Sequence, residues 1–179
     1  MLARLNLVNI AQKQMQALTA ETEETTFLAI RNDNQAVYIH KVMSPHMIRM
    51  DAEIGAQRPL NCTAAGKILL AWAETDLLLQ LKDQGLISKR TPNSITEIDA
   101  LQSELAEIRT QGYSIDRQEY VADAMCVAAP LFDRDHQLIG TITTSGPSFR
   151  VKDRVEEIAA LVIARANKIS DALGHRKPG

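Results

Sequence analysis

The chain has 179 residues, the length of one large domain, of which 45% are hydrophobic and 23% are charged. Its 20 Lys and Arg residues against 22 Asp and Glu residues leave a net charge of −2, so the chain lacks the basic excess with which a domain grips nucleic-acid phosphates. No apolar run approaches the ~20 residues of a membrane span, and no secretory signal is evident, so we expect a cytoplasmic protein with reduced cysteines at Cys62 and Cys126.

The first expected element is an amphipathic helix over residues 4–23. Leu7, Ala11, Met15 and Leu18 recur at helical spacing, with polar residues between them. An apolar stripe of this kind offers a surface to a second copy of the chain, because a lone monomer need not cover it. The pattern therefore predicts self-association.

A β-hairpin is expected next, with strands near 26–31 and 36–43. The Asn-Asp-Asn cluster between these strands tolerates left-handed turn conformations. The segment HMIRMDAEIG, residues 46–55, continues the strand pattern, and RPL at 58–60 is expected to end it.

Three helices are expected to follow this strand. The first begins with the small residues TAAG at 63–66, and the second is short and ends near Gly85. The third begins at the capping-box-like sequence TEID at 96–99 and ends at Gly112, where a C-terminal cap belongs.

The last part of the chain predicts a strand and loop in YSIDRQEY at 113–120, then a hairpin with strands near 124–132 and 137–145. A final helix is expected over about 151–173. Pro130 has no N–H to donate to a neighbouring strand, so it should mark a bulge or the edge of the sheet. Two hairpins separated by helices predict an antiparallel sheet with helices on its faces, which is an α+β domain.

The segment TAAGK matches the end of a phosphate-binding loop poorly, because an earlier glycine is missing and Ile68 stands where Ser or Thr is required. Two readings of Ala64, Ala65 and Gly66 remain open. Small residues allow a helix to pack tightly against a sheet, and they also let an anion reach the free N–H groups at a helix start.

Cys126 lies in the apolar strand AMCVAAP, where a buried cysteine normally behaves as a small hydrophobe. A nucleophilic role would require an electropositive and accessible setting, together with a histidine brought near by the fold. The four histidines show neither HxH nor HExxH spacing, so no metal site and no cofactor are expected.

Polar side chains flank this cysteine strand. Thr143 and Ser145 share one strand face, and a buried hydroxyl needs a hydrogen-bond partner, which is either the backbone or a ligand. Asp116 lies just ahead of the cysteine strand, and its simplest interpretation is a solvated loop carboxylate.

Three stretches, RPLNCTAAGKILLAW, GYSIDRQEY and MCVAAPLFDRDHQLIGTITTSGP, together resemble the effector-binding domain of IclR-family bacterial transcription regulators. Their order and spacing match over nearly the whole chain. The resemblance is greatest to regulators of sugar-acid and small-carboxylate catabolism. It implies a GAF-like fold, which is a curved and mostly antiparallel sheet flanked by helices.

The resemblance also implies a domain organisation. Residues 1–23 would be a linker helix and residues 24–179 the effector-binding domain, whereas the N-terminal winged helix-turn-helix of such regulators is absent from this chain. DNA would be bound only through that missing domain, and the sensor domains would form a homodimer or homotetramer. The chain itself would not be an enzyme.

The family places a small-molecule effector, a carboxylate such as a sugar acid, between the sheet and the helix after the proline-containing loop. Carried over by motif, the residues of this site are Ala64, Ala65, Gly66, Asp116, Ala124, Met125, Cys126, Thr143 and Ser145, with Met50 as a further wall. Residues 64–66 would present N–H groups to the acid, and Cys126 would be a wall residue. Thr143 stands where the family often has serine, and Ala64 where it often has glycine, so the pocket is reshaped.

Two other functions remain as alternatives to a ligand sensor. One is a GAF-like thiol enzyme that uses Cys126, with Cys62 as the resolving thiol. The other is an oligomerisation module with a vestigial pocket. Within the sensor hypothesis, Asp116 would repel a second bare carboxylate, which favours a hydroxy acid, a sugar acid or a hydrated keto acid over a simple dicarboxylate.

Overall fold

The computed structural model describes residues 2–176, and side chains from residue 6 onward, so Met1 and residues 177–179 of the expected domain bounds lie outside the described residues. The helices are α1 (Leu2–Thr22), α2 (Ala64–Ala71), α3 (Leu77–Asp83), α4 (Ile98–Gln111), α5 (Ser148–Val151) and α6 (Val155–Ala172), with a 3₁₀ turn η1 (Lys152–Arg154). The strands are β1 (Thr25–Asn32), β2 (Gln35–Val42), β3 (Gln57–Pro59), β4 (Ser114–Arg117), β5 (Ala124–Phe132) and β6 (Leu138–Pro147).

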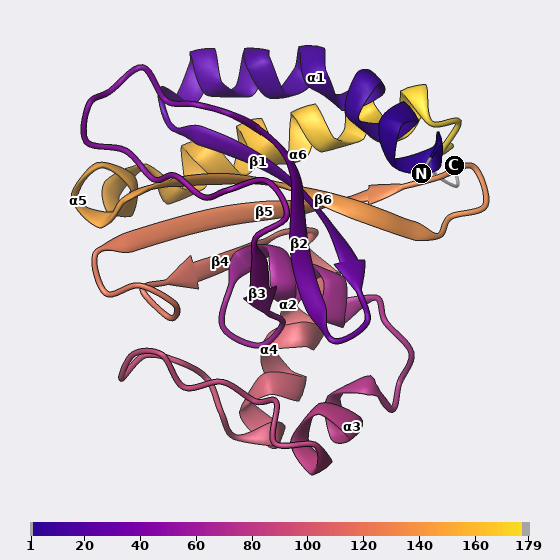
Figure 1. Cartoon of the computed structure of the whole chain (residues 1–179), viewed down its shortest axis with the longest axis vertical. Coiled ribbons are helices and arrows are strands. Elements are labelled where there is room, and N and C mark those ends of the chain that lie inside the picture. Colours follow the sequence, from indigo (N-terminus) through magenta and orange to yellow (C-terminus); the bar gives the residue numbers. More distant parts are fainter. Residues whose placement is uncertain (1, 177–179) are drawn as a thin grey trace.

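The strands form one curled sheet in the order β3-β2-β1-β6-β5-β4, and all neighbours are antiparallel (Figure 1). The predicted α+β, GAF-like class is therefore confirmed. Both hairpins form close to their predicted bounds, and Asp33 in the first turn takes a left-handed φ of 51°. Pro130 lies beyond the last pairing of β4 with β5, so this part of β5 is an edge, as predicted.

Helices cover both faces of the sheet. Helices α1 and α6 lie together on one face, and α2 lies on the other with α3 and α4 outside it (Figure 1). The alternation of β5 divides its side chains between these layers: Met125 and Val127 face α6, whereas Ala128 faces α2. The sheet thus separates an apolar core from a second layer that contains the polar residues discussed below.

The predicted strand at 46–55 is wrong, because residues 43–56 form no strand and the short β3 lies where a breaker was expected. Side chains satisfy the backbone of this segment in place of a ladder: Thr25 Oγ1 donates to Met50 O at 2.7 Å, and Lys41 Nζ donates to Ala52 O at 2.9 Å. Met47, Ile48 and Ile54 of this segment are exposed, Met47 to 98%, whereas Met50 is half-buried. The alternation therefore marked no buried face.

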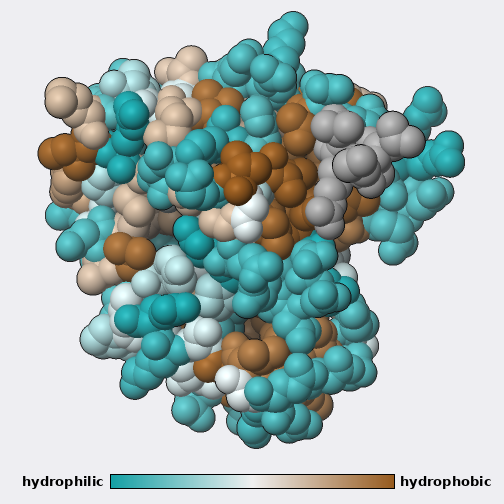
Figure 2. Space-filling model, in the orientation of Figure 1, coloured by the Kyte–Doolittle hydropathy of each residue, from teal (hydrophilic) through white to brown (hydrophobic). Residues whose placement is uncertain are grey.

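The apolar stripe of α1 is covered within the monomer. Leu7, Ala11, Met15 and Leu18 are all buried against the core that α6 completes. The stripe consequently supplies no argument for self-association, and that prediction now depends on the family resemblance alone. The side of the molecule shown in Figure 2 is largely hydrophilic, with hydrophobic side chains in separate groups.

Helix ends follow the predicted chemistry in part. Gly112 ends α4 in the left-handed region at φ 81°, as predicted, whereas the cap of α2 was not predicted: Thr63 Oγ1 accepts from Gly66 N at 3.0 Å. The capping box expected at α4 does not form, because its N-cap is Glu97 and no side chain caps the helix there. None of the described helices is both long and apolar enough to cross a membrane.

Candidate functional site

A cavity of about 110 Å³ lies where the start of α2 faces the sheet. One water needs only ~10–15 Å³, so the cavity has room for a small organic molecule. Its walls come from β1, β2, β4, β5 and β6, the segment at 50–58, the start of α2, and the loop after β4.

Most of the predicted site residues meet in this one cavity, although they come from distant parts of the chain. Those that line it are Ala64, Ala65, Asp116, Ala124, Cys126, Thr143 and Ser145, and Met50 forms a further wall as expected.

Gly66 and Met125 do not line the cavity. Met125 points into the core on the opposite sheet face, because neighbouring strand residues alternate. Gly66 is needed for close packing: a Cβ there would lie 2.4 Å from Pro59 O, and its N–H already donates to Thr63 Oγ1. The tight-packing interpretation therefore applies to Gly66, and the open N–H groups are those of Ala64 and Ala65.

The N–H groups of Ala64 and Ala65 at the start of α2 donate to no acceptor among residues 2–176. Free N–H groups at a helix N-terminus, with the positive end of the helix dipole, favour an anion. The two methyl side chains leave the backbone accessible from the cavity. This wall is suited to a carboxylate.

Two hydroxyl groups of β6 form the facing wall. Thr143 is 1% exposed, and its Oγ1 has no hydrogen-bond partner within the described part of the chain. Ser145 Oγ lies 3.0 Å from Cys126 Sγ. A buried hydroxyl without a partner costs roughly 1–3 kcal/mol in proteins, and a ligand oxygen in the cavity would relieve that cost.

The thiols are not poised for nucleophilic chemistry. Burial raises the pKa of the Cys126 thiol well above its usual range, and the neighbouring charge of Asp116 raises it further. Burial likewise raises the pKa of Cys62 to about 12. Both thiols are therefore protonated at neutral pH, whereas a nucleophile requires the thiolate.

Asp116 is a buried wall residue, 3% exposed, and not the solvated loop carboxylate of the simplest interpretation. Burial raises its pKa to about 7; the hydrogen bond from Glu119 N opposes this rise, and the negative charge of Glu119 contributes to it. Its Oδ1 accepts that hydrogen bond at 2.6 Å. Near neutral pH the group can consequently either donate or accept a hydrogen bond.

Comparison with known proteins decides the family. The chain matches the family described as "Bacterial transcriptional regulator IclR C-terminal" over residues 1–171. The chain belongs to the IclR family. Its fold and its layered sheet are those of the C-terminal, effector-binding domain of these regulators.

Relatives of the IclR domain described here include the HTH-type transcriptional regulator KdgR of Escherichia coli K12, 35% identical over 97% of this chain and 66% of KdgR. The HTH-type transcriptional repressor AllR of the same organism is 34% identical over 94% of this chain and 63% of AllR. The crystal structure of the C-terminal domain of E. coli KdgR is 35% identical, covers 94% of this chain and 99% of that domain, and has a TM-score of 0.83. The chain spans 63% to 66% of the length of these two curated relatives.

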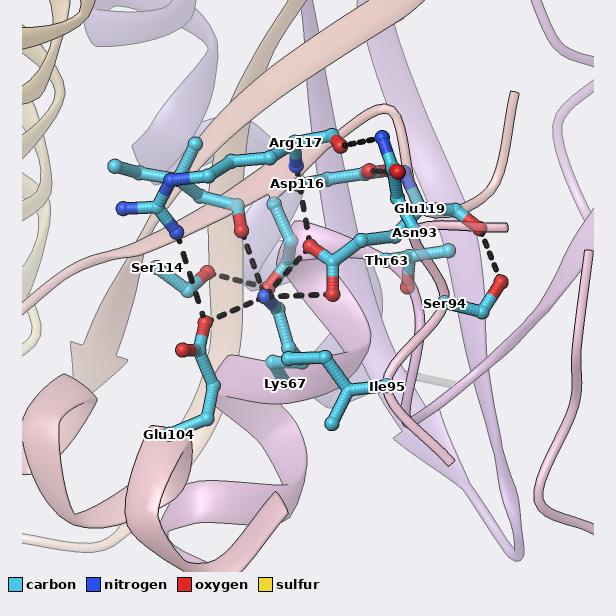
Figure 3. Close-up of polar contacts among 12 residues, drawn as sticks. Thr63, Lys67, Asn93, Ser94, Ile95, Glu104, Ser114, Asp116, Arg117 and Glu119 are labelled. Atoms are coloured by element: carbon cyan, nitrogen blue, oxygen red, sulfur yellow. Dashed lines mark hydrogen bonds and ion pairs between the residues drawn. The ribbon is translucent and has the colours of Figure 1, made fainter. Parts of the chain in front are cut away.

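Sequence reasoning missed Lys67, the centre of a buried ion cluster in this IclR domain (Figure 3). Its side chain is fully buried, and Nζ donates to Glu104 at 2.6 Å, to Glu119 at 2.8 Å and to Ile115 O at 2.7 Å. The cluster joins α2 and α4 to β4, which carries Asp116, and to the loop after it. A lysine inside the apolar run KILLAW was the available signal, because a fully buried lysine must be paired.

Arg58, Tyr38 and Tyr120 also line the cavity and were not predicted. Arg58 was interpreted only as part of a strand-ending sequence. Nothing in the local pattern shows that two tyrosines far apart in the sequence meet the same arginine, because their contact depends on the sheet and the loop after β4. Among the described residues, no group of three or more His, Cys, Asp and Glu side chains is arranged to hold a metal ion.

Proposed function

We propose that this cavity binds a small carboxylate with a neighbouring hydroxyl or keto oxygen, and that binding modulates the DNA affinity of the full-length regulator. The main support is the unpartnered hydroxyl of Thr143, which shares a small cavity with the open N–H groups of Ala64 and Ala65. Unpaired donors and acceptors that converge on one cavity need a partner that the protein itself does not supply.

The ligand carboxylate is held at the start of α2, where N–H groups and the helix dipole favour negative charge. Its other oxygens reach Thr143, Ser145 and Asp116 across the cavity. At 110 Å³ the cavity is small compared with the ~300–1,000 Å³ pockets that hold drug-sized ligands, which favours a compact acid.

Asp116 restricts the choice of acid. An ionised Asp116 accepts a hydrogen bond from a ligand hydroxyl but repels a second carboxylate. Hydroxy acids, sugar acids and hydrated keto acids are thus preferred over simple dicarboxylates. Cys126 contributes a small wall beside Ser145 and takes no part in chemistry.

In the complete regulator, we propose that residues 1–23 connect this domain to an N-terminal DNA-binding domain and that sensor domains associate. The net charge of −2 supports a chain that does not bind DNA specifically by itself. Sequence-specific retardation of DNA by this chain at physiological salt would contradict the proposal that DNA is bound by the N-terminal domain and not by this chain.

A thermal-shift screen of glycolate, lactate, glycerate, pyruvate and gluconate tests the proposal, since a ligand at 100 times its dissociation constant adds about 2.7 kcal/mol. Calorimetry then compares Ser145→Ala and Asp116→Ala with the parent. Loss of a polar partner should weaken binding of the best acid about 5- to 150-fold. Ser103→Ala, on the exposed face of α4, is the matched control. If Ser145→Ala and Asp116→Ala bind as tightly as the parent, the proposed site is wrong.

A further inference from the structure

Arg58 lines the cavity, yet none of the ion pairs among the described residues accounts for its charge. Its one hydrogen bond runs from Nη1 to Gln57 O, at 2.9 Å. Asp51 also lines the cavity, but its carboxylate forms an ion pair with Lys41, with Nζ and Oδ1 2.5 Å apart. The guanidinium therefore has donors to offer to a ligand.

Two aromatic rings contact this guanidinium. Arg58 Cζ lies over the Tyr38 ring at 5.4 Å and over the Tyr120 ring at 5.3 Å from the centroids. Tyr38 in turn stacks on Phe27 at 4.5 Å and an interplanar angle of 16°. Cation–π contacts use none of the N–H donors of a guanidinium, so these donors remain able to bind a planar acid.

Arg58 also lies on the same side of the cavity as the start of α2. The next residue, Pro59, accepts a hydrogen bond from Thr63 Oγ1 at 2.9 Å, and Gly66 packs directly against that carbonyl. Arg58 is thus close along the backbone to the start of α2, and Arg58, Ala64 and Ala65 all line the same cavity.

The fully buried lysine of this region, Lys67, is not available to a ligand. Lys67 Nζ is saturated by two carboxylates and a carbonyl, those of Glu104, Glu119 and Ile115. An acid that enters the cavity meets Asp116 on another wall, so a positive charge is needed to favour it. Arg58 is the cavity-lining cation that is positioned to supply that charge.

We propose that Arg58 binds the effector carboxylate through the edge of its guanidinium and makes the site select anionic over neutral ligands. This inference rests on the proposed function, because it names the charge-selecting residue of the same cavity. Arginine and a carboxylate form short, charge-assisted and often bidentate hydrogen bonds, which a neutral amide cannot reproduce.

The experiment measures affinity for acid and amide pairs by calorimetry, with lactate against lactamide, glycerate against glyceramide, and gluconate against gluconamide. In Arg58→Gln we expect affinity for the best acid to fall about tenfold or more, with affinity for its amide unchanged. Arg58→Lys keeps the positive charge but lacks the planar pair of N–H donors that binds a carboxylate in a bidentate way. This variant should therefore lose part of the preference for the acid over its amide. Arg90→Gln is the matched control, because Arg90 stacks on Tyr120 at 5.4 Å but does not line the cavity.

The outcomes separate the two proposals. If Ser145→Ala weakens acid binding while Arg58→Gln and Arg58→Lys keep the parental acid-to-amide ratio, the role of Arg58 is wrong and the effector site stands. If none of the acids binds the parent, both proposals fail. Circular dichroism of each ligand-free variant verifies the fold, and Arg58→Lys decides the matter should Arg58→Gln not fold.

Discussion

Two buried polar regions lie beside each other in this domain, and they differ in how far the protein satisfies them. In the ion cluster, Lys67 is bonded to Glu104 and Glu119, and Glu119 also accepts from Arg117 N at 3.1 Å. In the cavity, Thr143 has no partner and Asp116 has no ion pair among the described residues. Asp116 and Glu119 are only three residues apart, yet Asp116 lines the cavity whereas Glu119 pairs with the buried Lys67.

This contrast distinguishes structure from binding. A buried charge whose hydrogen bonds are complete holds segments together, and its removal should harm stability. A buried polar group that lacks a partner contributes little to stability and is available to a ligand. The variants below test this distinction in order of their expected effect on stability.

The largest effect is expected for Lys67→Met, which leaves Glu119 buried and unpaired. We expect the free energy of unfolding, measured by urea denaturation, to fall by about 3–5 kcal/mol. Arg31→Met breaks the exposed Arg31–Glu74 pair instead and should cost less than about 1 kcal/mol. Glu119→Gln added to Lys67→Met should recover part of the loss. A Lys67→Met domain as stable as Arg31→Met would refute the structural role of the cluster.

Asp116→Asn should change how stability depends on pH. The folded pKa of about 7 lies above the ordinary value of 3.8, so between these values the folded state binds more protons than the unfolded chain. Stability of the parent therefore falls as pH rises through this window, by up to about 1.4 kcal/mol per pH unit from this group, and levels off above the folded pKa.

The measurement is urea denaturation of parent and Asp116→Asn at intervals from pH 4 to pH 8. The variant lacks the contribution, so its stability relative to the parent should increase toward neutral pH. Asp135→Asn, on the exposed turn between β5 and β6, is the control for a surface change. A stability difference that stays constant across this range would show that Asp116 is not a buried acid with a raised pKa.

The smallest effect on stability is expected for Thr143→Val, which removes an unpartnered hydroxyl and keeps the shape. The free energy of unfolding should stay within about 1 kcal/mol of the parent or rise, while binding of the best acid weakens about 5- to 150-fold. Thr144→Val is a close control: this neighbour is also buried and unpartnered but lies on the opposite sheet face, so it should leave binding unchanged. Equal losses of affinity in the two variants would contradict the placement of the ligand.

Much of the fold could be predicted because its signals are local. The hairpin turn at Asp33, the helix end at Gly112 and the edge at Pro130 follow from the conformations that these residues allow. The segment 46–55 misled the prediction because alternation alone does not show whether a core lies beside it. The buried α1 stripe misled it in the same way, since α6 covers that stripe from the far end of the chain.

By itself, the sequence determined the order of elements, the α+β class and, through its motifs, the IclR family. Only the tertiary structure decided which polar residues are satisfied. The carboxylates that pair with Lys67 and the tyrosines that contact Arg58 come from segments distant in the chain, and Thr143 Oγ1 is left without a partner by the elements packed around it. Strand alternation placed Met125 in the core, and contact with Pro59 assigned Gly66 to packing. Hydrogen bonding and burial depend on contacts across the whole fold, and no local pattern records them.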